Sequence, residues 1–274
     1  MNIKVLYPKN QIIKKYVHYY YQFNSDHKAL NECYQAYPHI NTPVCFYNNM
    51  EVNIIKDGLE FSTLKNPKFQ IGIIGKINKP LSCRCKGELF AITIVFKPLG
   101  LNQFISCPFE SISAYTFQQF NEWLPYSHIL EPLLSTDQDE EIIEHLDQFL
   151  QNIYNPFTFP LLQKAMLLMD EDNDNLKEIE SKTGINRKML LRLFEKHLGI
   201  SPTLYKRINR FRKVLEHQKL KEINLTQTAY ETYFSDQSHF IKDIKKLSGE
   251  APKRLLDEAI YICDSPFLMK LKKY

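Results

Sequence analysis

Residues 187–202 read RKMLLRLFEKHLGISP and residues 237–252 read QSHFIKDIKKLSGEAP, and these two stretches show how the second half of the chain is organised. Both carry apolar residues four positions apart and end in Gly-x-x-Pro. Gly and Pro fix backbone geometry, so their recurrence at matched positions favours a duplicated unit over a helical bundle whose helices are alike by chance. The pairs, 50 residues apart, are Ile179/Ala229, Leu190/Phe240, Arg192/Lys242, Phe194/Ile244, Lys196/Lys246, Gly199/Gly249 and Pro202/Pro252.

Each copy predicts a short helix, a tight turn and a longer helix, which is a helix-turn-helix unit. Ser201-Pro202 is a strong helix start, and the helix that follows would join the two units. After Pro160 the apolar periodicity predicts helices over 161–169, 176–183, 186–197, 201–218, 226–233, 236–247 and 252–260.

The second helix of each unit would face the core through its apolar anchors and present its other side to DNA. Exposed residues at i, i+1, i+4 and i+5 form one strip that fits a major groove, where Arg grips guanine, Gln grips adenine, and Leu or Ile meets a thymine methyl. The predicted base-reading residues are Arg187, Lys188, Leu191 and Arg192 in the first unit and Gln237, Ser238, Ile241 and Lys242 in the second. The alternative is that these eight residues are solvated surface residues that contact no base, with Leu191 and Ile241 partly buried.

Charge is unevenly distributed along the chain. Residues 1–159 carry 13 basic and 15 acidic side chains, whereas residues 187–254 carry 16 basic and 7 acidic ones. A basic half suggests contact with a polyanion, although lysine-rich surfaces also serve solubility. The predicted DNA phosphate contacts are Asn186, Lys196, Lys206, Arg207, His239, Lys245 and Lys246.

Residues 1–158 predict a β-rich domain, a small antiparallel sandwich or barrel with helices at its C-terminal side. Short runs rich in β-branched and aromatic residues are separated by Pro, Gly, Asn and Asp, and Asp57-Gly58 is a hairpin signal. Residues 139–153 predict a helix with one apolar stripe, which would pack on its own domain or on a second subunit. Asn155-Pro156 ends that helix and marks the domain boundary. We expect the helical domain over 159–262 and a basic tail over 263–274.

The segment FEKHLGISPTLYKRINRFR, residues 194–212, resembles the linker region of the AraC/XylS family of regulators. SDQSHFIKDIKKLSGEAP, residues 235–252, is similar to the second helix-turn-helix of that family, and Phe96-Lys97-Pro98-Leu99-Gly100 resembles a turn in the N-terminal domain of some AraC-like regulators. The resemblance covers about 160–260. It implies a seven-helix domain whose two recognition helices enter successive major grooves, roughly 34 Å apart. It also implies promoter DNA and RNA polymerase as partners, with an N-terminal domain that senses a small-molecule effector or forms a homodimer.

Two residues depart from the family pattern. Tyr233 stands where Gly is usual at the turn of the second unit, and a bulky residue at positive φ would be strained. Ala251 stands where many members have a capping Ser or Thr, which would weaken that helix start by about 1 kcal/mol.

Other functional classes have less support in the sequence. It has no secretory signal, membrane-length apolar run, Gly-x-Ser-x-Gly, His-Glu-x-x-His or phosphate-binding Gly loop. Six cysteines do not make a dense disulfide framework, and Cys83-Arg84-Cys85 lacks the ligand count of a zinc site. We therefore expect a cytoplasmic, non-enzymatic transcriptional regulator without metal or cofactor. The alternatives are a DNA-targeted enzyme with a reactive cysteine and an interaction protein that has lost DNA recognition.

Overall fold

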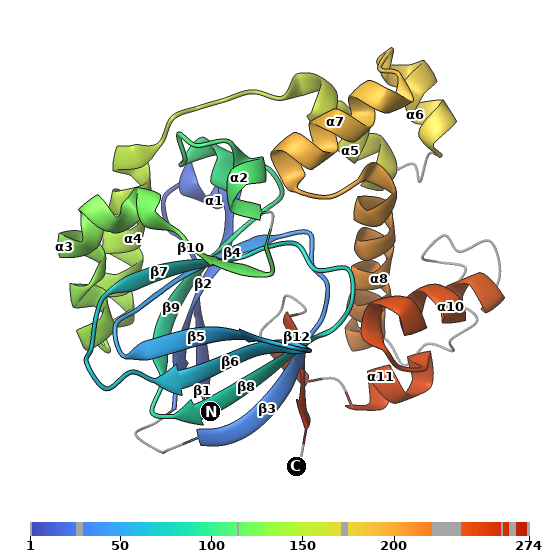
Figure 1. Ribbon diagram of the computed structural model, residues 1–274. Helices are drawn as coiled ribbons and strands as arrows, with labels where there is room; N and C mark the ends of the chain where they lie inside the picture. Colours follow the sequence, from blue (N-terminus) through green and yellow to red (C-terminus); the bar gives the residue numbers. More distant parts are fainter. Residues whose placement is uncertain are drawn as a thin grey trace.

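The computed structural model describes residues 2–25, 30–113, 115–170, 175–220, 237–258, 260–262 and 267–272 of the 274-residue chain. A strand-rich body comes first, and a set of helices packs along one side of it (Figure 1). This arrangement confirms the predicted α+β class. No helix in these ranges is both long and apolar enough to cross a membrane.

Two six-stranded sheets make up the strand-rich body. The strands are β1 (Asn2–Leu6), β2 (Val17–Asn24), β3 (Leu30–Ala36), β4 (Thr42–Tyr47), β5 (Met50–Ile55), β6 (Gly58–Thr63), β7 (Gln70–Ile74), β8 (Leu81–Gly87), β9 (Phe90–Phe96), β10 (Phe117–Gln119), β11 (Ile260–Ile262) and β12 (Phe267–Lys272). The first sheet has the order β1-β2-β9-β4-β7-β10 and the second β11-β12-β3-β8-β6-β5. All neighbours are antiparallel except β6 and β8, which are parallel.

Strand β9 separates two apolar cores. Because side chains alternate along a strand, Ile92, Ile94 and Phe96 share one face, and Ala91 lies on the other, between the two sheets. The run FAITIVF is therefore apolar on both faces, as a fully covered central strand requires.

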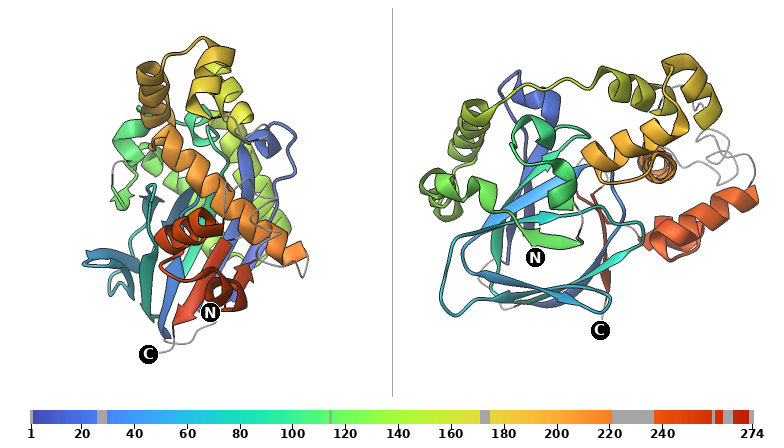
Figure 2. Two further views of the ribbon diagram at one scale, coloured as in Figure 1. Left: turned by 90° about the vertical axis from the view of Figure 1, so that its right-hand side faces the viewer. Right: turned by 45° about the horizontal axis from the view of Figure 1, so that its top comes forward.

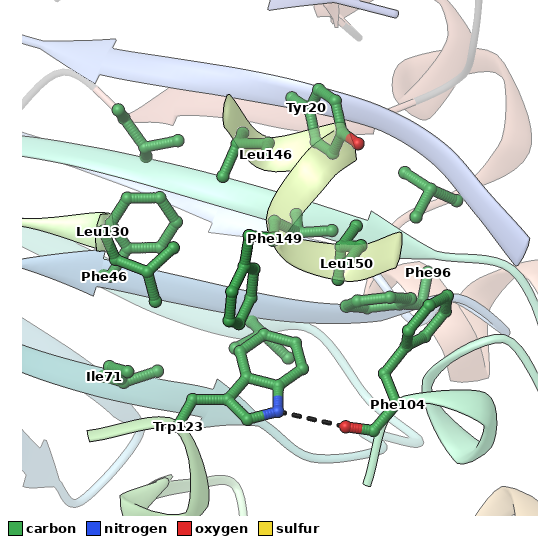
Figure 3. Close-up of a cluster of buried hydrophobic side chains, with 14 of the residues drawn as sticks. Tyr20, Phe46, Ile71, Phe96, Phe104, Trp123, Leu130, Leu146, Phe149 and Leu150 are labelled. Carbon is green, nitrogen blue, oxygen red and sulfur yellow. Dashed lines mark hydrogen bonds between the residues drawn. The ribbon is translucent and has the colours of Figure 1, made fainter. Parts of the chain in front are cut away.

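Helix α4 (Asp139–Ile153) covers the outer face of the first sheet, together with the short helices α1 (Ile13–Tyr16), α2 (Phe109–Ser113) and α3 (Ser127–Leu130) and 3₁₀ turns at Leu101–Gln103, Asn121–Tyr126 and Pro132–Ser135. Leu146, Phe149 and Leu150 of α4 point into the cluster around Trp123 (Figure 3). The indole N–H of Trp123 donates to the carbonyl of Phe104 at 3.1 Å. The apolar stripe thus packs on its own domain, which removes it as a surface for a second subunit.

Asp147 ties α4 to the N-terminal strands from a buried position. One carboxylate oxygen accepts the backbone N–H groups of Lys9 and Asn10, both at 2.7 Å, and the other accepts the Tyr20 hydroxyl at 2.6 Å. Burial, followed by the Asp147 carboxylate, raises the pKa of Tyr20, so its proton stays in this hydrogen bond. A buried carboxylate needs such donors to offset its desolvation.

Asp147→Ala is expected to lower the free energy of unfolding by about 2–3 kcal/mol, because the buried Tyr20 hydroxyl and two partly buried backbone N–H groups lose a charged acceptor. Denaturant unfolding followed by Trp123 fluorescence measures this, since Trp123 is the single tryptophan of the chain. Glu144→Ala removes an exposed carboxylate from the same helix and serves as the control. Equal losses in the two variants would show that Asp147 contributes only helix charge.

The helical domain contains α5 (Pro160–Asp170), α6 (Leu176–Thr183), α7 (Arg187–Leu198), α8 (Pro202–Leu220), α10 (Gln237–Ser248) and α11 (Pro252–Glu258). Six of the seven predicted helices are thus present in the described ranges, within two residues of their expected ends. The helix predicted over 226–233 and the turn residue Tyr233 lie outside the described residues. Ala251 immediately precedes α11.

The two domains share a core. Tyr37 and Leu99 of the N-terminal domain belong to the apolar cluster of the helical domain, and the Tyr37 ring meets Phe211 of α8 at a centroid distance of 6.3 Å. At the far end of α7, Gly199 lies against Ser113 and Phe109 of α2, where a Cβ would meet the Ser113 hydroxyl oxygen at 2.5 Å.

The C-terminal segment corrects one expectation. Residues 263–274 were expected to form a separate basic tail, but β12 pairs with β3 in the register Met269 to Ala36 and Lys272 to Cys33. The basic charge of this segment suggested a tail. Its pairing with a strand more than 200 positions earlier depends on tertiary contacts, which cannot be inferred from local composition. The chain therefore returns to the N-terminal domain after the helical domain.

Candidate nucleic-acid interface

Helix α7 is the predicted recognition helix of the first unit, and its ends are set by local chemistry. The Asn186 side chain caps the start by accepting the Met189 N–H at 2.9 Å, and Gly199 ends the helix at φ 70°. Leu190, Phe194 and Leu198, spaced four apart, are buried. The side chains predicted to read bases, Arg187, Lys188, Leu191 and Arg192, are all exposed on the remaining surface of the helix.

Helix α10 repeats this arrangement in the second unit. Phe240, Ile244 and Leu247 are buried, while Ser238 and Lys242 are exposed and Ile241 is half-buried. Gln237 is the first residue of the helix; its side chain lies outside what the structure describes.

Helix α8 connects the two units. Its 19 residues span about 28 Å at 1.5 Å per residue. Helices α7 and α10 both lie beside α8 (Figures 1 and 2): Phe194 of α7 meets the Tyr205 ring, and Asp243 of α10 accepts from Arg207. Both contacts lie in the N-terminal half of α8, so the two recognition helices share one support.

Polar side chains of α8 connect it to each neighbouring element. Toward α5, Tyr205 and Asn209 donate to the Asp170 carboxylate at 3.1 and 2.6 Å, and Lys213 donates to the Asp170 carbonyl. Toward α10, Arg207 reaches the Asp243 carboxylate at 2.8 Å. The Arg207 contact therefore holds the second recognition helix on α8, and the Asp170 contacts hold α5 on it.

The predicted phosphate contacts divide into two groups. Lys196, Lys245 and Lys246 are exposed, and Lys206 is half-buried. Asn186, by contrast, serves as the cap of α7, while Arg207 and His239 lie against the buried Asp243 carboxylate. The Arg207 guanidinium, with its side chain 18% exposed, is therefore occupied within the protein. Sequence reasoning missed Asp243, whose only signal is an acid within a strongly basic stretch.

A cavity in the N-terminal domain opens against α8. It measures about 730 Å³ including its open side, and aromatic and aliphatic side chains from both sheets form most of its wall. Arg212 of α8 lines the same cavity, together with His39 and Asn41. Arg212 is buried, and its guanidinium donates to the carbonyls of Pro38 and Tyr37 at 2.7 and 2.8 Å.

Basic residues lie in and beside this end of the cavity, where Arg212 and His39 line it and Lys76 contacts the backbone of Asn41. Lys76 donates to the carbonyls of Ile40 and Asn41 at 2.5 and 2.7 Å, and burial lowers its pKa to about 7. Burial, followed by the charges of Arg212 and Lys76, holds the pKa of His39 well below its usual value, and its Nδ1 accepts the Asn41 N–H at 2.8 Å. An anionic group entering here would meet the positive charge of the Arg212 guanidinium.

Four cysteine thiols of the described residues are poorly suited to nucleophilic chemistry. Burial raises the pKa of Cys45 and Cys85 to about 12 and that of Cys107 to about 11, and it also raises that of Cys83. A raised pKa disfavours the thiolate, which is the nucleophile. No group of three or more His, Cys, Asp or Glu within the described ranges is arranged to hold a metal ion.

Comparison with known proteins agrees with the helical architecture. Residues 179–258 match a family model described as a helix-turn-helix domain. The uncharacterized HTH-type transcriptional regulator YbfI of Bacillus subtilis (strain 168) is 35% identical over an alignment of 114 residues, and the match covers 36% of this chain. The chain spans 40% of the length of that relative.

Structures of ToxT from Vibrio cholerae are among the solved structures that the chain matches. The P21 crystal form shares 14% sequence identity with a TM-score of 0.48, covering 87% of this chain and 97% of ToxT. ToxT bound to an unsaturated fatty acid shares 15% identity with a TM-score of 0.41, covering 85% of this chain and 96% of ToxT.

Proposed function

We propose, on the premise that residues 179–258 are a helix-turn-helix domain of the AraC/XylS type, that the chain is an effector-responsive transcriptional regulator that binds double-stranded DNA sequence-specifically. The observation that carries the proposal is the pair of exposed strips on α7 and α10, two helices that both pack on α8. Each strip enters one major groove, and the two grooves are successive on one face of the duplex. RNA polymerase and a second copy of the chain are the protein partners we expect at the promoter.

The side chains of the strips match the chemistry of base edges. Arg187 and Arg192 can each grip guanine O6 and N7 with two N–H groups, and Leu191 can meet a thymine methyl. The exposed Lys196, Lys245 and Lys246 would contact phosphates, which adds affinity without sequence preference. Binding is therefore expected to weaken steeply as salt concentration rises.

Sequencing the genomic fragments retained by the full-length protein tests the proposal. At near-physiological salt we expect one enriched bipartite motif whose halves lie about 10 base pairs apart. The same selection with the Arg187→Ala/Arg192→Ala variant is the control for enrichment that depends on the first strip. Retention of all fragments alike by the wild-type protein would support the interaction-protein alternative instead.

Arg192→Ala is expected to weaken binding to the enriched motif by about 1–3 kcal/mol and to relax preference at one base pair. Fluorescence anisotropy with each of the four base pairs at that position measures both effects. Lys65→Ala removes one exposed positive charge from the N-terminal domain and serves as the control. An equal loss on all four sequences would make Arg192 a phosphate contact.

The cavity at Arg212 is the proposed effector site. Its apolar walls and basic end suit a small molecule with an apolar body and an anionic group, and Arg212 belongs to the helix that carries both units. An occupant that binds Arg212 would compete with the carbonyls of Tyr37 and Pro38, and so would alter the docking of α8 on the N-terminal domain. The effector would then bind differently to the protein with α8 docked as it is here and to the protein with α8 docked otherwise. A ligand needs such a difference in affinity to shift the equilibrium between two states.

A further inference from the structure

The second recognition helix is held on α8 by a buried charge cluster. Asp243 is 6% exposed and lies between Lys242 and Ile244 on α10. Its Oδ1 accepts the Nε and Nη2 protons of Arg207 at 3.1 and 2.8 Å. Its Oδ2 lies 3.7 Å from Nη2 of Arg210 and 3.8 Å from Nε2 of His239.

The first recognition helix has a different residue at the matched position. In the 50-residue repeat Asp243 corresponds to Leu193, which is half-buried and packs against the apolar core of the helical domain. The second copy therefore carries a charged, directional contact where the first copy carries an apolar one. Equivalent packing of α10 would not need a buried carboxylate.

The ion pairs of Asp243 constrain the orientation of α10 more than they add to the free energy of folding. A buried ion pair gains little net free energy because both partners lose hydration, and its best-attested structural role is to specify one arrangement. Burial lowers the pKa of Arg210, and the Asp243 charge acts in the opposite direction, so the two arginines and the carboxylate depend on one another. The apolar anchors Phe240 and Ile244 supply burial, but without direction.

We propose that Asp243 is a positioning residue which, through Arg207 and Arg210, sets the orientation of α10 and thereby the recognition of the second half-site. The inference rests on the proposed function. In this proposal Arg207 contacts Asp243 inside the protein, whereas the sequence suggests that it contacts a DNA phosphate. Rotation of α10 about its axis would turn Ser238 and Lys242 away from the groove, so loss of the cluster affects the second half-site selectively.

The test uses full-length protein and two DNA duplexes, one with both half-sites intact and one with the second half-site scrambled. The wild-type protein should prefer the intact duplex. For Asp243→Asn we expect a tenfold or greater loss of affinity for the intact duplex and unchanged affinity for the scrambled one. Glu195→Gln removes the same charge from an exposed position on α7 and should leave the preference for the intact second half-site unchanged.

Arg207→Lys separates positioning from phosphate contact. Lysine keeps the charge but loses the two N–H groups directed at Oδ1, so a positioning role predicts loss of second half-site discrimination, whereas a phosphate contact predicts affinity near that of the wild type. Asp243→Leu, the residue of the first copy, provides a second folded variant with the same expected loss. If Asp243→Asn and Arg207→Lys both keep the wild-type preference, the positioning role is wrong. If the wild-type protein itself shows no preference between the duplexes, the proposed function fails.

Discussion

Phe194→Ala is expected to lower the free energy of unfolding of the helical domain by about 3–5 kcal/mol. Phe194 is fully buried on α7 and meets the Tyr205 ring of α8 edge to face at a centroid distance of 5.5 Å. Truncation leaves a cavity between the first recognition helix and the linking helix, so DNA binding should be lost together with helical structure.

Two spectroscopic signals measure this effect separately in each domain. Circular dichroism in the far ultraviolet follows mainly the helical domain, and Trp123 fluorescence follows the N-terminal core in which that residue is buried. Phe157→Ala is the matched control because Phe157 is 57% exposed. A loss below about 1 kcal/mol, similar to that of the control, would contradict the assignment of Phe194 as the anchor of α7.

Arg212→Ala is expected to cost about 3–5 kcal/mol in the docking of the two domains, because two buried carbonyls lose a charged donor. In the wild-type protein we expect the fluorescence and circular dichroism transitions to coincide, since the domains share a core. In the variant they should separate. Arg84→Ala, which truncates an exposed arginine on β8, is the control.

The same variant tests the proposed effector site. A panel of small carboxylates with apolar bodies should raise the melting temperature of the wild-type protein, and Arg212→Ala should abolish the shift for any compound that produces one. A compound that stabilises both proteins equally would bind elsewhere, which would contradict the role of Arg212.

The duplicated units were predictable because they depend on local signals. Asn186 and Gly199 bound α7 by their own hydrogen bonding and backbone preference, and Phe194 and Phe240 recur at the period of a helix. The exposure of Arg192 and Lys242 follows from the same periodicity. Their contact with bases stays a prediction.

The roles of the α8 side chains were less predictable. Charge alone suggested that Arg207 meets phosphate, but the position of Asp243, 36 residues later, gives that guanidinium an internal partner. Arg212 likewise reaches carbonyls 174 and 175 positions earlier in the chain. Sequence periodicity shows which face of a helix is polar, whereas only the tertiary fold shows what that face meets. The apolar stripe on α4 is a second example. Its periodicity predicts that the stripe is buried, but it does not show whether the stripe packs on its own sheet or on a second subunit.

Hydroxyl-radical footprinting of the full-length protein on its enriched DNA shows whether α7 and α10 read successive major grooves. We expect two protected windows on one face of the duplex, about 10 base pairs apart, with Arg187→Ala/Arg192→Ala losing one window and Asp243→Asn losing the other. A single window, or two windows on opposite faces, would contradict the claim that α7 and α10 read successive major grooves.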